Sequence, residues 1–357
     1  MEIKVTQVEP QQMKAKPKDE SQLGFGRIFT DHFFHAKYDG EKGWHNASIE
    51  PVRPLSLDPA SMCLHYGQEI FEGMKAYRGE DDSIYLFRPE ENIKRMARSA
   101  ERLCMQPMDG DLFMEGLKKL VLLEKDWIPR DAGTSLYIRP TMIATEVALG
   151  VHPSNRYMFF IIAGPVGAYY PEGFSPTKIY VSEKYTRSAP GGVGDCKAGG
   201  NYAASLYASR EASEMGYTQV LWLDAKERKY VEEVGTSNIF FVIGDDLITP
   251  PLAGSILPGV TRDSVIRLAR SWGVNVLEKQ LSIDDVLSAN ADGTLKEVFA
   301  SGTAAIVSPV GQIYCRGKEY VIGDGRTGSL TERLYGEILQ IQYGKKEDPF
   351  GWRVKIS

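Results

Sequence analysis

A lysine surrounded by glycines is the residue of this sequence best placed for covalent chemistry. Lys197 lies in the segment GGVGDCKAGGNY, residues 191–202, which is the densest glycine cluster of the chain. Glycines on both sides permit sharp bends and let a planar ligand approach the backbone closely. A desolvated lysine amine is a good nucleophile. A glycine hairpin with a solvated lysine has the same pattern, so this segment alone does not decide between the two.

Three further segments could bind the polar parts of a phosphorylated ligand. Gly259, Val260 and Thr261 open an amphipathic helix, where N–H groups and a hydroxyl suit a phosphate, although an ordinary threonine cap looks the same. The segment ASGTAAIVSP, residues 300–309, offers a second Gly–Thr turn with small neighbours. Glu233 ends a predicted strand before the turn GTSN, a position that more often holds a solvated charge.

A lysine nucleophile, two phosphate-binding turns and a separate carboxylate together suit pyridoxal 5′-phosphate. The lysine would bind the aldehyde of this cofactor, and the carboxylate would keep the pyridine nitrogen protonated so that the ring accepts electrons. The sequence contains no GxSxG elbow, no GxxxxGK[ST] loop and no complete GxGxxG. His32 and His35 form an HxxH pair without other ligands at suitable spacing, so we expect no metal site.

The composition is that of an ordinary globular protein. The 357 residues are 43% hydrophobic and 25% charged with a net charge of −5, which excludes fibrous repeats and gives no basic surface for nucleic acid or anionic membrane. The four cysteines form no CxxC pair and the N-terminus has no apolar signal segment, so we expect a cytoplasmic protein. The most apolar run, 157–170, is too short to span a bilayer.

The pattern of helices and strands predicts two α+β domains. Helices are expected at about 92–105, 111–123, 201–216, 261–273 and 330–342, and the strongest strand patterns cover 135–145 and 157–166. Strands grouped in hairpins, as at Gly244–Asp245–Asp246, favour this class over a doubly wound sheet. We expect a poorly ordered tail over 1–20, a smaller α/β domain over 21–167, an interdomain loop over 168–177 and a larger cofactor-binding α+β domain over 178–357.

Eight segments spread over nearly the whole chain resemble the branched-chain amino acid aminotransferases, which are fold-type IV pyridoxal-phosphate enzymes. They are LHYGQEIFEGMKAYRG, LFRPEENIKRMARSAERL, SLYIRPTMIATEVALGV, GPVGAYYPEG, GGVGDCKAGGNYAASL, VEEVGTSNIFF, ILPGVTRDSVI and SGTAAIVSPVG. The resemblance implies the two-domain fold of that class with pyridoxal 5′-phosphate at the domain interface. It also implies a homodimer.

The same resemblance assigns roles to individual residues. Lys197 would carry the cofactor and later move a proton, Glu233 would pair with the ring nitrogen, and Tyr202 would bind the phenolic oxygen. The phosphate would be held by Arg95, Val260, Thr261 and Thr303. The substrate would contact Tyr66, Phe71, Tyr137, Arg139, Leu149, Val151, Tyr169, Thr236 and Ala304. Without the resemblance, Arg95 would be interpreted as an exposed charge on a helix.

The substrate residues can be compared with strand geometry. Tyr137 and Arg139 are two residues apart on a predicted strand and therefore face the same side, although a surface pair would show the same spacing. In the family that this chain resembles, such an arginine binds the distal carboxylate of glutamate, and the loop matching Leu149 and Val151 reaches the partner subunit. A pocket with aromatic walls and one arginine suits both branched alkyl chains and a carboxylate.

The expected activity is ping-pong transamination of leucine, isoleucine and valine with 2-oxoglutarate. The alternatives of the same fold are a D-amino acid transaminase and an aminodeoxychorismate lyase, which the segments GVTRDSVI and SLYIRP resemble less. A non-catalytic protein that binds pyridoxal phosphate or phosphate is the alternative of a different class. The order of preference among the three amino acids and the biosynthetic or catabolic direction stay open.

Overall fold

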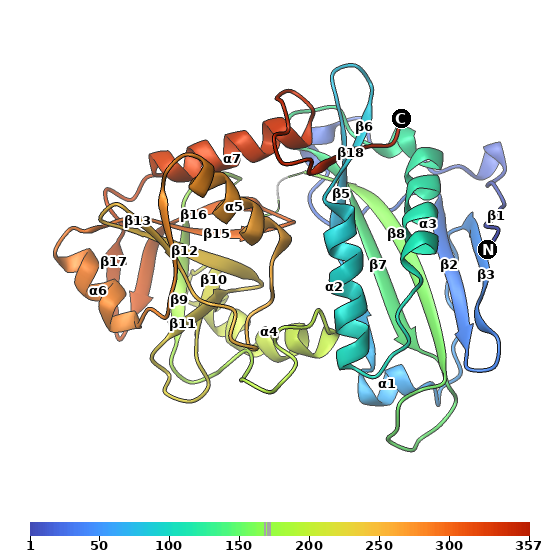
Figure 1. The fold of residues 1–357 in the computed structure, drawn as a ribbon, viewed down its shortest axis with the longest axis horizontal. Coiled ribbons are helices and arrows are strands. Elements are labelled where there is room, and N and C mark those ends of the chain that lie inside the picture. Colours follow the sequence, from blue (N-terminus) through green and yellow to red (C-terminus); the bar gives the residue numbers. More distant parts are fainter. Residues whose placement is uncertain (168, 170–172) are drawn as a thin grey trace. The chain divides into compact units, whose positions relative to one another are not determined.

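The computed structural model describes residues 1–167, 169 and 173–357, which divide into two compact units (Figure 1). The first unit contains residues 1–169, 196–199 and 339–357, and the second contains residues 170–195 and 200–338. The first boundary lies inside the predicted interdomain loop 168–177, of which residues 168 and 170–172 are outside the described residues. From Thr177 the chain is already a strand of the second unit.

The secondary structure follows the sequence patterns closely for the long elements. The α-helices are α1 (Met62–Tyr66), α2 (Pro89–Arg102), α3 (Gly110–Leu123), α4 (Gly199–Glu214), α5 (Val260–Ser271), α6 (Ile283–Ala291) and α7 (Ser329–Gln342). The short 3₁₀ helices are η1 (Pro10–Gln12), η2 (Glu20–Gln22) and η3 (Lys125–Trp127). Five of the α-helices, α2 to α5 and α7, coincide with predicted ones to within about three residues at either end, whereas α1 and α6 were not predicted.

Nine strands of the described residues form the sheet of the first unit. They are β1 (Lys4–Val5), β2 (His32–Asp39), β3 (Gly43–Pro51), β4 (Glu69–Phe71), β5 (Met74–Arg78), β6 (Ile84–Phe87), β7 (Ser135–Ala144), β8 (Arg156–Val166) and β18 (Arg353–Lys355). The order is β1-β3-β2-β8-β7-β5-β6-β18, and β4 pairs with β7 outside this path. The predicted strands over 135–145 and 157–166 are its long antiparallel centre.

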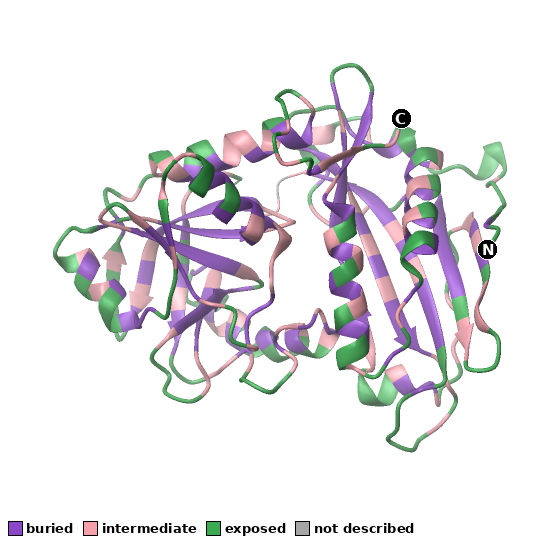
Figure 2. Cartoon of the chain, viewed as in Figure 1, coloured by how far each residue is buried: buried purple, intermediate pink, exposed green. Residues whose placement is uncertain are grey.

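Helices α2 and α3 cover one face of this sheet (Figure 1). Helix α2 begins with a proline and two glutamates, a sequence that suits the positive end of a helix dipole. Its buried side meets the sheet, and the outer side of α3 is exposed (Figure 2). The core beneath α3 contains Phe34, Phe113 and Phe159, which pack edge to face with ring centroids 4.8–6.0 Å apart.

The second unit contains another sheet of nine strands among the described residues. They are β9 (Thr177–Ser182), β10 (Gln219–Leu223), β11 (Val231–Val234), β12 (Ser237–Ile243), β13 (Asp246–Thr249), β14 (Asn275–Glu278), β15 (Leu295–Gly302), β16 (Ile306–Cys315) and β17 (Lys318–Val321). The order is β11-β10-β9-β16-β15-β12-β13-β14, with β17 on β16, and β11 also pairs with β12. The last pairing closes a circuit of strands and so leaves β11 and β12 without open edges.

Helices α5 and α6 pack on β15 of this sheet. The predicted hairpin at Gly244–Asp245–Asp246 is confirmed, because β12 and β13 pair up to Ile243 and Asp246 around it. Gly244 has a φ of 61° there, in the left-handed region that glycine adopts without strain. The predicted α+β class with hairpin-connected strands therefore describes both units.

The two ends of the chain differ from the predicted domain limits. The segment over 1–20 contains β1, which pairs with β3, and Val8 donates a backbone hydrogen bond of 2.8 Å to Nε2 of His32. At the other end, β18 pairs with β6, so the last residues join the sheet of the first unit rather than the second. Both differences arise from strand pairing between distant segments, which local sequence patterns do not report.

Among the described residues, no helix combines the length and apolar character needed to cross a membrane.

One glycine of β8 is required by a close backbone approach, and this gives a test of the sheet. A Cβ atom at Gly164 would lie 1.9 Å from the carbonyl oxygen of Ile28, whereas a Cβ at Gly336 in α7 would meet nothing within 4 Å. We expect Gly164→Ala to lower the free energy of unfolding by about 1–3 kcal/mol because a backbone segment must move. Gly336→Ala should raise it by about 0.5–1 kcal/mol through helix propensity.

The check is the thermal midpoint of both variants, measured side by side. If Gly164→Ala were as stable as the wild type, the close packing of the segment around Ile28 against β8 would be wrong.

Candidate active site

The backbone of Lys197 is held on both sides within the first unit. Its N–H donates to Oγ of Ser99 on α2 over 3.0 Å, and its carbonyl oxygen accepts the N–H of Phe71 on β4 over 3.0 Å. Ala198, the next residue, forms a bridge with Ile70. The glycine-rich segment is therefore anchored at the lysine, unlike the solvated hairpin that its composition also permitted.

The ring of Phe71 lies close to two cationic side chains. Nζ of Lys197 is 4.9 Å from the ring centroid, and the guanidinium carbon of Arg139 is 4.6 Å from it. Arg139 also donates to the hydroxyl of Tyr137 over 2.9 Å, so the predicted shared face of these two residues on β7 is confirmed. Nε of Arg139 is buried, and no partner for it occurs among the described residues, so it is available to a ligand oxygen.

A buried ion pair between Arg95 and Glu72 lies next to this cluster, because Glu72 directly follows Phe71 in the chain. Nε and Nη2 of Arg95 donate to the two carboxylate oxygens of Glu72 over 2.7 and 2.9 Å, and Asn92 donates to the same carboxylate over 2.8 Å. Burial alone would raise the pKa of Glu72, but the charge and hydrogen bonds of Arg95, with the nearby charge of Lys197, hold that pKa below its ordinary value. Arg95 is thus a buried residue of α2, and the interpretation as an exposed charge is wrong.

Aromatic side chains extend the site beyond Phe71. Phe25 packs edge to face on Tyr137 and on Tyr169, with centroids 4.8 and 4.9 Å apart. Phe25 lies in the segment GFG, residues 24–26, which stops short of a complete GxGxxG. The structure therefore brings Tyr137 and Tyr169 together through a residue that the sequence did not single out.

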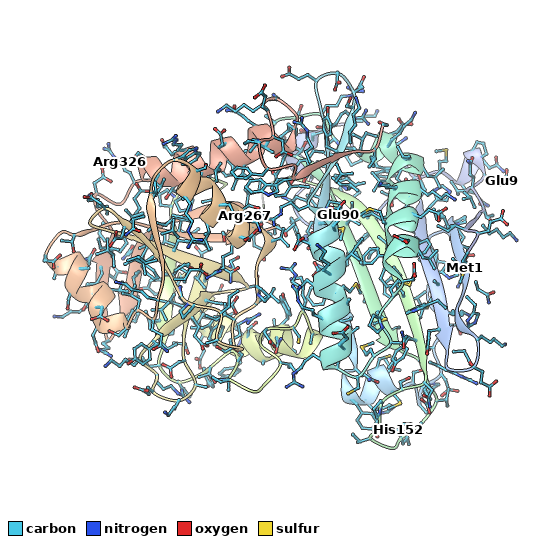
Figure 3. The ribbon with its side chains drawn as sticks, in the orientation of Figure 1. Met1, Glu9, Glu90, His152, Arg267 and Arg326 are labelled. Atoms are coloured by element: carbon cyan, nitrogen blue, oxygen red, sulfur yellow. The ribbon has the colours of Figure 1, made fainter. Side chains whose placement is uncertain are left out.

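The loop between β7 and β8, which carries His152 (Figure 3), contains two further predicted residues. Tyr66, at the end of α1, donates its hydroxyl to the carbonyl oxygen of Leu149. Leu149 and Val151 are 65% and 84% exposed. Within this chain, these two side chains do not join the cluster around Phe71.

In the second unit, Glu233 is buried on β11 and held from two sides. Oε2 accepts from Nη1 of Arg187 over 2.5 Å, and Oε1 accepts from Nδ2 of Asn238 over 3.3 Å. The solvated turn charge that its position suggested is therefore excluded. The guanidinium carbon of Arg187 also lies 5.7 Å from the ring centroid of Tyr202 on α4. Glu233 and Tyr202, both predicted to contact the cofactor, thus both lie close to the guanidinium of Arg187.

The start of α5 lies next to the same cluster. The amide of Asn238 also donates to the carbonyl oxygen of Leu257 over 3.0 Å, and a Cβ at Gly259 would lie 2.1 Å from its Oδ1. Gly259 is the N-terminal cap of α5 and offers no capping side chain to the first turn, which contains Val260 and Thr261. A helix end of this kind suits an anion.

Two predicted turns lie at the same end of the strand pair formed by β12 and β15 in the second sheet. Strand β12 begins at Ser237 and pairs antiparallel with β15, which ends at Gly302, and Asn238 is opposite Ser301. Thr236, just before β12, therefore lies at the same end of this strand pair as Thr303 and Ala304, just after β15. A Cβ at Gly302 would approach Oγ of Ser237 to 3.1 Å, so the glycine lets the two turns come close together.

A second lysine of the first unit has unusual chemistry. Lys75 on β5 is opposite Tyr137 on β7 and is buried. Desolvation lowers its pKa from 10.5 to about 7, so that near neutral pH a large fraction is the nucleophilic amine. Sequence reasoning missed Lys75, and its position inside the motif EGMKAYR would have been the only signal.

The two histidines of the HxxH pair lie on β2. In the part of the chain that the structure describes, no three His, Cys, Asp or Glu side chains gather as metal ligands would. His32 instead bonds through Nδ1 to the buried carboxylate of Glu124.

These features match a known family. The model described as Amino-transferase class IV matches residues 69–313, and the chain belongs to this family. It is 55% identical to branched-chain-amino-acid transaminase 1 of Bacillus subtilis over 344 residues, which cover 96% of each protein. The resemblance seen in the sequence is confirmed.

Solved structures agree on the fold. The branched-chain amino acid aminotransferase of Escherichia coli superimposes with a TM-score of 0.75 at 32% identity, covering 86% of this chain and 97% of that one. The branched-chain aminotransferase of the archaeon Thermoproteus uzoniensis, solved with norvaline, gives a TM-score of 0.75 at 25% identity, covering 91% of this chain and 100% of that one. The expected α+β fold of fold-type IV aminotransferases is confirmed.

The buried ion pair between Glu72 and Arg95 should contribute to the stability of the protein. Glu72→Gln removes the carboxylate that faces the buried charge of Arg95, and we expect a loss of about 3–5 kcal/mol in the free energy of unfolding. Glu115→Gln, which removes the exposed pair with Lys119 on the neighbouring helix, should leave it almost unchanged because solvent screens such a pair. Chemical denaturation near pH 7 measures both variants.

The contribution of Glu72 to the free energy of unfolding should depend on pH. Because the pKa of Glu72 is lowered on folding, its contribution is present above the ordinary carboxylate value and is lost as the pH falls through the lower, folded value. The difference between wild type and Glu72→Gln should therefore shrink in acid. Equal effects of the two substitutions would show that the Glu72 pair does not hold the site.

Proposed function

We propose that this protein is a pyridoxal-phosphate-dependent branched-chain amino acid transaminase that exchanges amino groups between leucine, isoleucine or valine and 2-oxoglutarate. The observation that carries the proposal is the cluster in which Lys197 and Arg139 both approach the ring of Phe71. A nucleophilic amine and a carboxylate-binding cation beside one apolar surface suit a substrate that is an aliphatic amino acid in one half-reaction and glutamate in the other.

Bound pyridoxal phosphate would supply an aldehyde that accepts the amino group and a ring that takes up electrons from the substrate Cα. The residues present fit this group. Lys197 has an anchored backbone and a side chain that reaches toward Phe71, as a covalent anchor requires. The amine of Lys197 would also move the proton of the substrate Cα as general base and acid.

The polar ends of the cofactor are assigned to the other residues that the sequence suggested. Glu233 pairs with the ring nitrogen and Tyr202 donates to the phenolic oxygen. The phosphate is held by Val260, Thr261 and Thr303, with the helix end of α5 as the support for this assignment. Arg95 commits two donors to Glu72, which fixes its guanidinium, and its assignment to the phosphate is the least direct of these.

The substrate is held by charge at one end and by apolar packing along its length. Arg139 binds the distal carboxylate of glutamate, and its buried Nε supports this role. Phe71, Tyr137 and Tyr169 pack against branched alkyl chains. The turn containing Thr303 and Ala304, with Thr236 at the same end of the strand pair, holds the α-carboxylate shared by all substrates.

The assembly is proposed to be a homodimer. Leu149 and Val151 stay exposed in one chain, as expected if their loop completes the pocket of a second copy. A cytoplasmic location is also inferred, because the cysteines form no pattern typical of an oxidising compartment.

The two alternatives of the same fold are less well supported. The relatives at about half identity over nearly the full length are named branched-chain aminotransferases, as with the Bacillus subtilis protein at 55%. A D-amino acid transaminase or an aminodeoxychorismate lyase would have to differ from them in substrate despite this likeness.

Replacing Lys197 tests the covalent role. Lys197→Ala should abolish turnover, reducing kcat by at least about 10³-fold, while circular dichroism stays unchanged. Lys226→Ala, in an exposed turn, is the matched control and should retain activity. In the wild type, borohydride reduction followed by peptide mapping should place the cofactor on Lys197. Labelling of Lys75 instead would reassign the anchor to the other nucleophilic lysine.

Replacing Arg139 separates the two half-reactions. Arg139→Met removes a charge-assisted hydrogen bond worth about 1.5–3 kcal/mol. That corresponds to about 10- to 150-fold in kcat/KM for glutamate or 2-oxoglutarate. Leucine lacks the second carboxylate, so its half-reaction should change by less than about tenfold. Each half-reaction is followed separately by cofactor absorbance. Equal losses for both substrates would mean that Arg139 binds the shared α-carboxylate or only supports the fold.

A further inference from the structure

Arg187 occupies an unusual position for an arginine. It lies in the loop after β9, its side chain is 2% exposed, and it forms a 2.5 Å ion pair with the equally buried Glu233. Its Nε is buried, and no partner for it occurs among the described residues. Burying an arginine costs free energy unless its charge is paired and hydrogen-bonded with good geometry. None of the roles implied by family resemblance includes it.

Arg187 bonds directly to one carboxylate, that of Glu233, and its charge also acts on the neighbouring Glu232. Glu233 accepts its hydrogen bond, and the ring of Tyr202 lies 5.7 Å from its guanidinium carbon. The neighbouring Glu232 is on the opposite side of the strand, where it accepts from Oγ of Ser255 over 2.5 Å, and burial raises its pKa. Asn238 contributes a neutral donor to Glu233. Arg187 is therefore a cation in direct contact with Glu233.

We propose that Arg187 is a positioning residue that keeps Glu233 ionised and oriented, so that the proton shared between Glu233 and the cofactor's ring nitrogen stays on the nitrogen. This inference rests on the proposed function and deepens it. Burial by itself makes a carboxylate a stronger base, and Glu233 would then take the proton from the nitrogen. A guanidinium at 2.5 Å opposes this, because it favours the charged form of the carboxylate.

The proposed effect of Arg187 concerns the position of a single proton. One proton is shared by two atoms, Oε of Glu233 and the ring nitrogen, and it moves between them without any further reactant. With Arg187 present it resides on the nitrogen, where it makes the ring the electron acceptor that the reaction needs. Without Arg187 it resides on Glu233, and the neutral ring accepts electrons less well.

The experiment compares variants of the holoenzyme. Arg187→Met should lower kcat by about 10- to 100-fold, corresponding to one or two pKa units in the proton distribution, with a much smaller change in KM. Arg187→Lys keeps the charge and should recover most of the rate. Arg316→Met, which removes an exposed arginine ion-paired with Glu183 and Asp284 in the same unit, is the control and should leave kcat unchanged. Cofactor content and thermal midpoint are measured for each.

Two readouts separate positioning from support of the fold. The deficit of Arg187→Met relative to wild type should shrink as the pH is lowered from about 8.5 to 6, because acid adds a second proton and restores the one on the nitrogen. Arg187→Met combined with Glu233→Gln should be no slower than Glu233→Gln alone, since Arg187 acts through Glu233.

The outcomes are distinct. A deficit that is independent of pH, or fully multiplicative losses in the double variant, would overturn the inference, as would a kcat of Arg187→Met within twofold of wild type. If Arg187→Met did not fold, Arg187→Lys would be compared with wild type over the same pH range and should lose activity mainly at alkaline pH. A wild-type protein that does not transaminate would instead reject the proposed function itself.

Discussion

The lysine site of the first unit depends on a buried ion pair that does not include the lysine. Neither Glu72 nor Arg95 could be buried alone, since an isolated charge in the interior is strongly unfavourable. Their pairing therefore fixes α2 against the turn that follows β4. One helical turn after Arg95, Ser99 binds the backbone of Lys197, and β4 supplies Phe71 from the other side. The same electrostatic contact thus determines both groups that anchor Lys197.

Local patterns predict the elements of this site but not the contacts between them. The apolar period of α2 and the strand pattern of β7 are visible in the sequence, and so is the shared face of Tyr137 and Arg139. The burial of Arg95 is not visible, because a helical period assigns charged residues to the solvent side unless a distant partner neutralises them. That partner, Glu72, is 23 residues away and meets Arg95 only after the sheet has formed.

The second unit shows the same division between local and distant information. Glu233 and Asn238 are five residues apart on a tight hairpin, and their pairing follows from the turn that the sequence indicates. The contact with Arg187 spans 46 residues and joins a loop to a strand, so no periodicity reports it. Gly259 combines local and distant information. The sequence shows a glycine at the start of a helix, but the close approach of Asn238 that requires a glycine there depends on tertiary packing.

Lys197, the proposed anchor of the cofactor, differs from Lys75 in more than the reactivity of its amine. Burial lowers the pKa of Lys75 to about 7, so part of this lysine is uncharged near neutral pH. Its backbone, however, lies in β5 between β6 and β7, and its side chain is buried. Lys197 has a backbone anchored at one point, and its chain then enters α4, which carries Tyr202 five residues later. A lysine that must bind a cofactor, release it to substrate and then move a proton requires a fixed backbone with a side chain that can swing. The glycine-rich segment gives Lys197 an anchored backbone and a side chain that is only partly buried, whereas the side chain of Lys75 in the strand is buried.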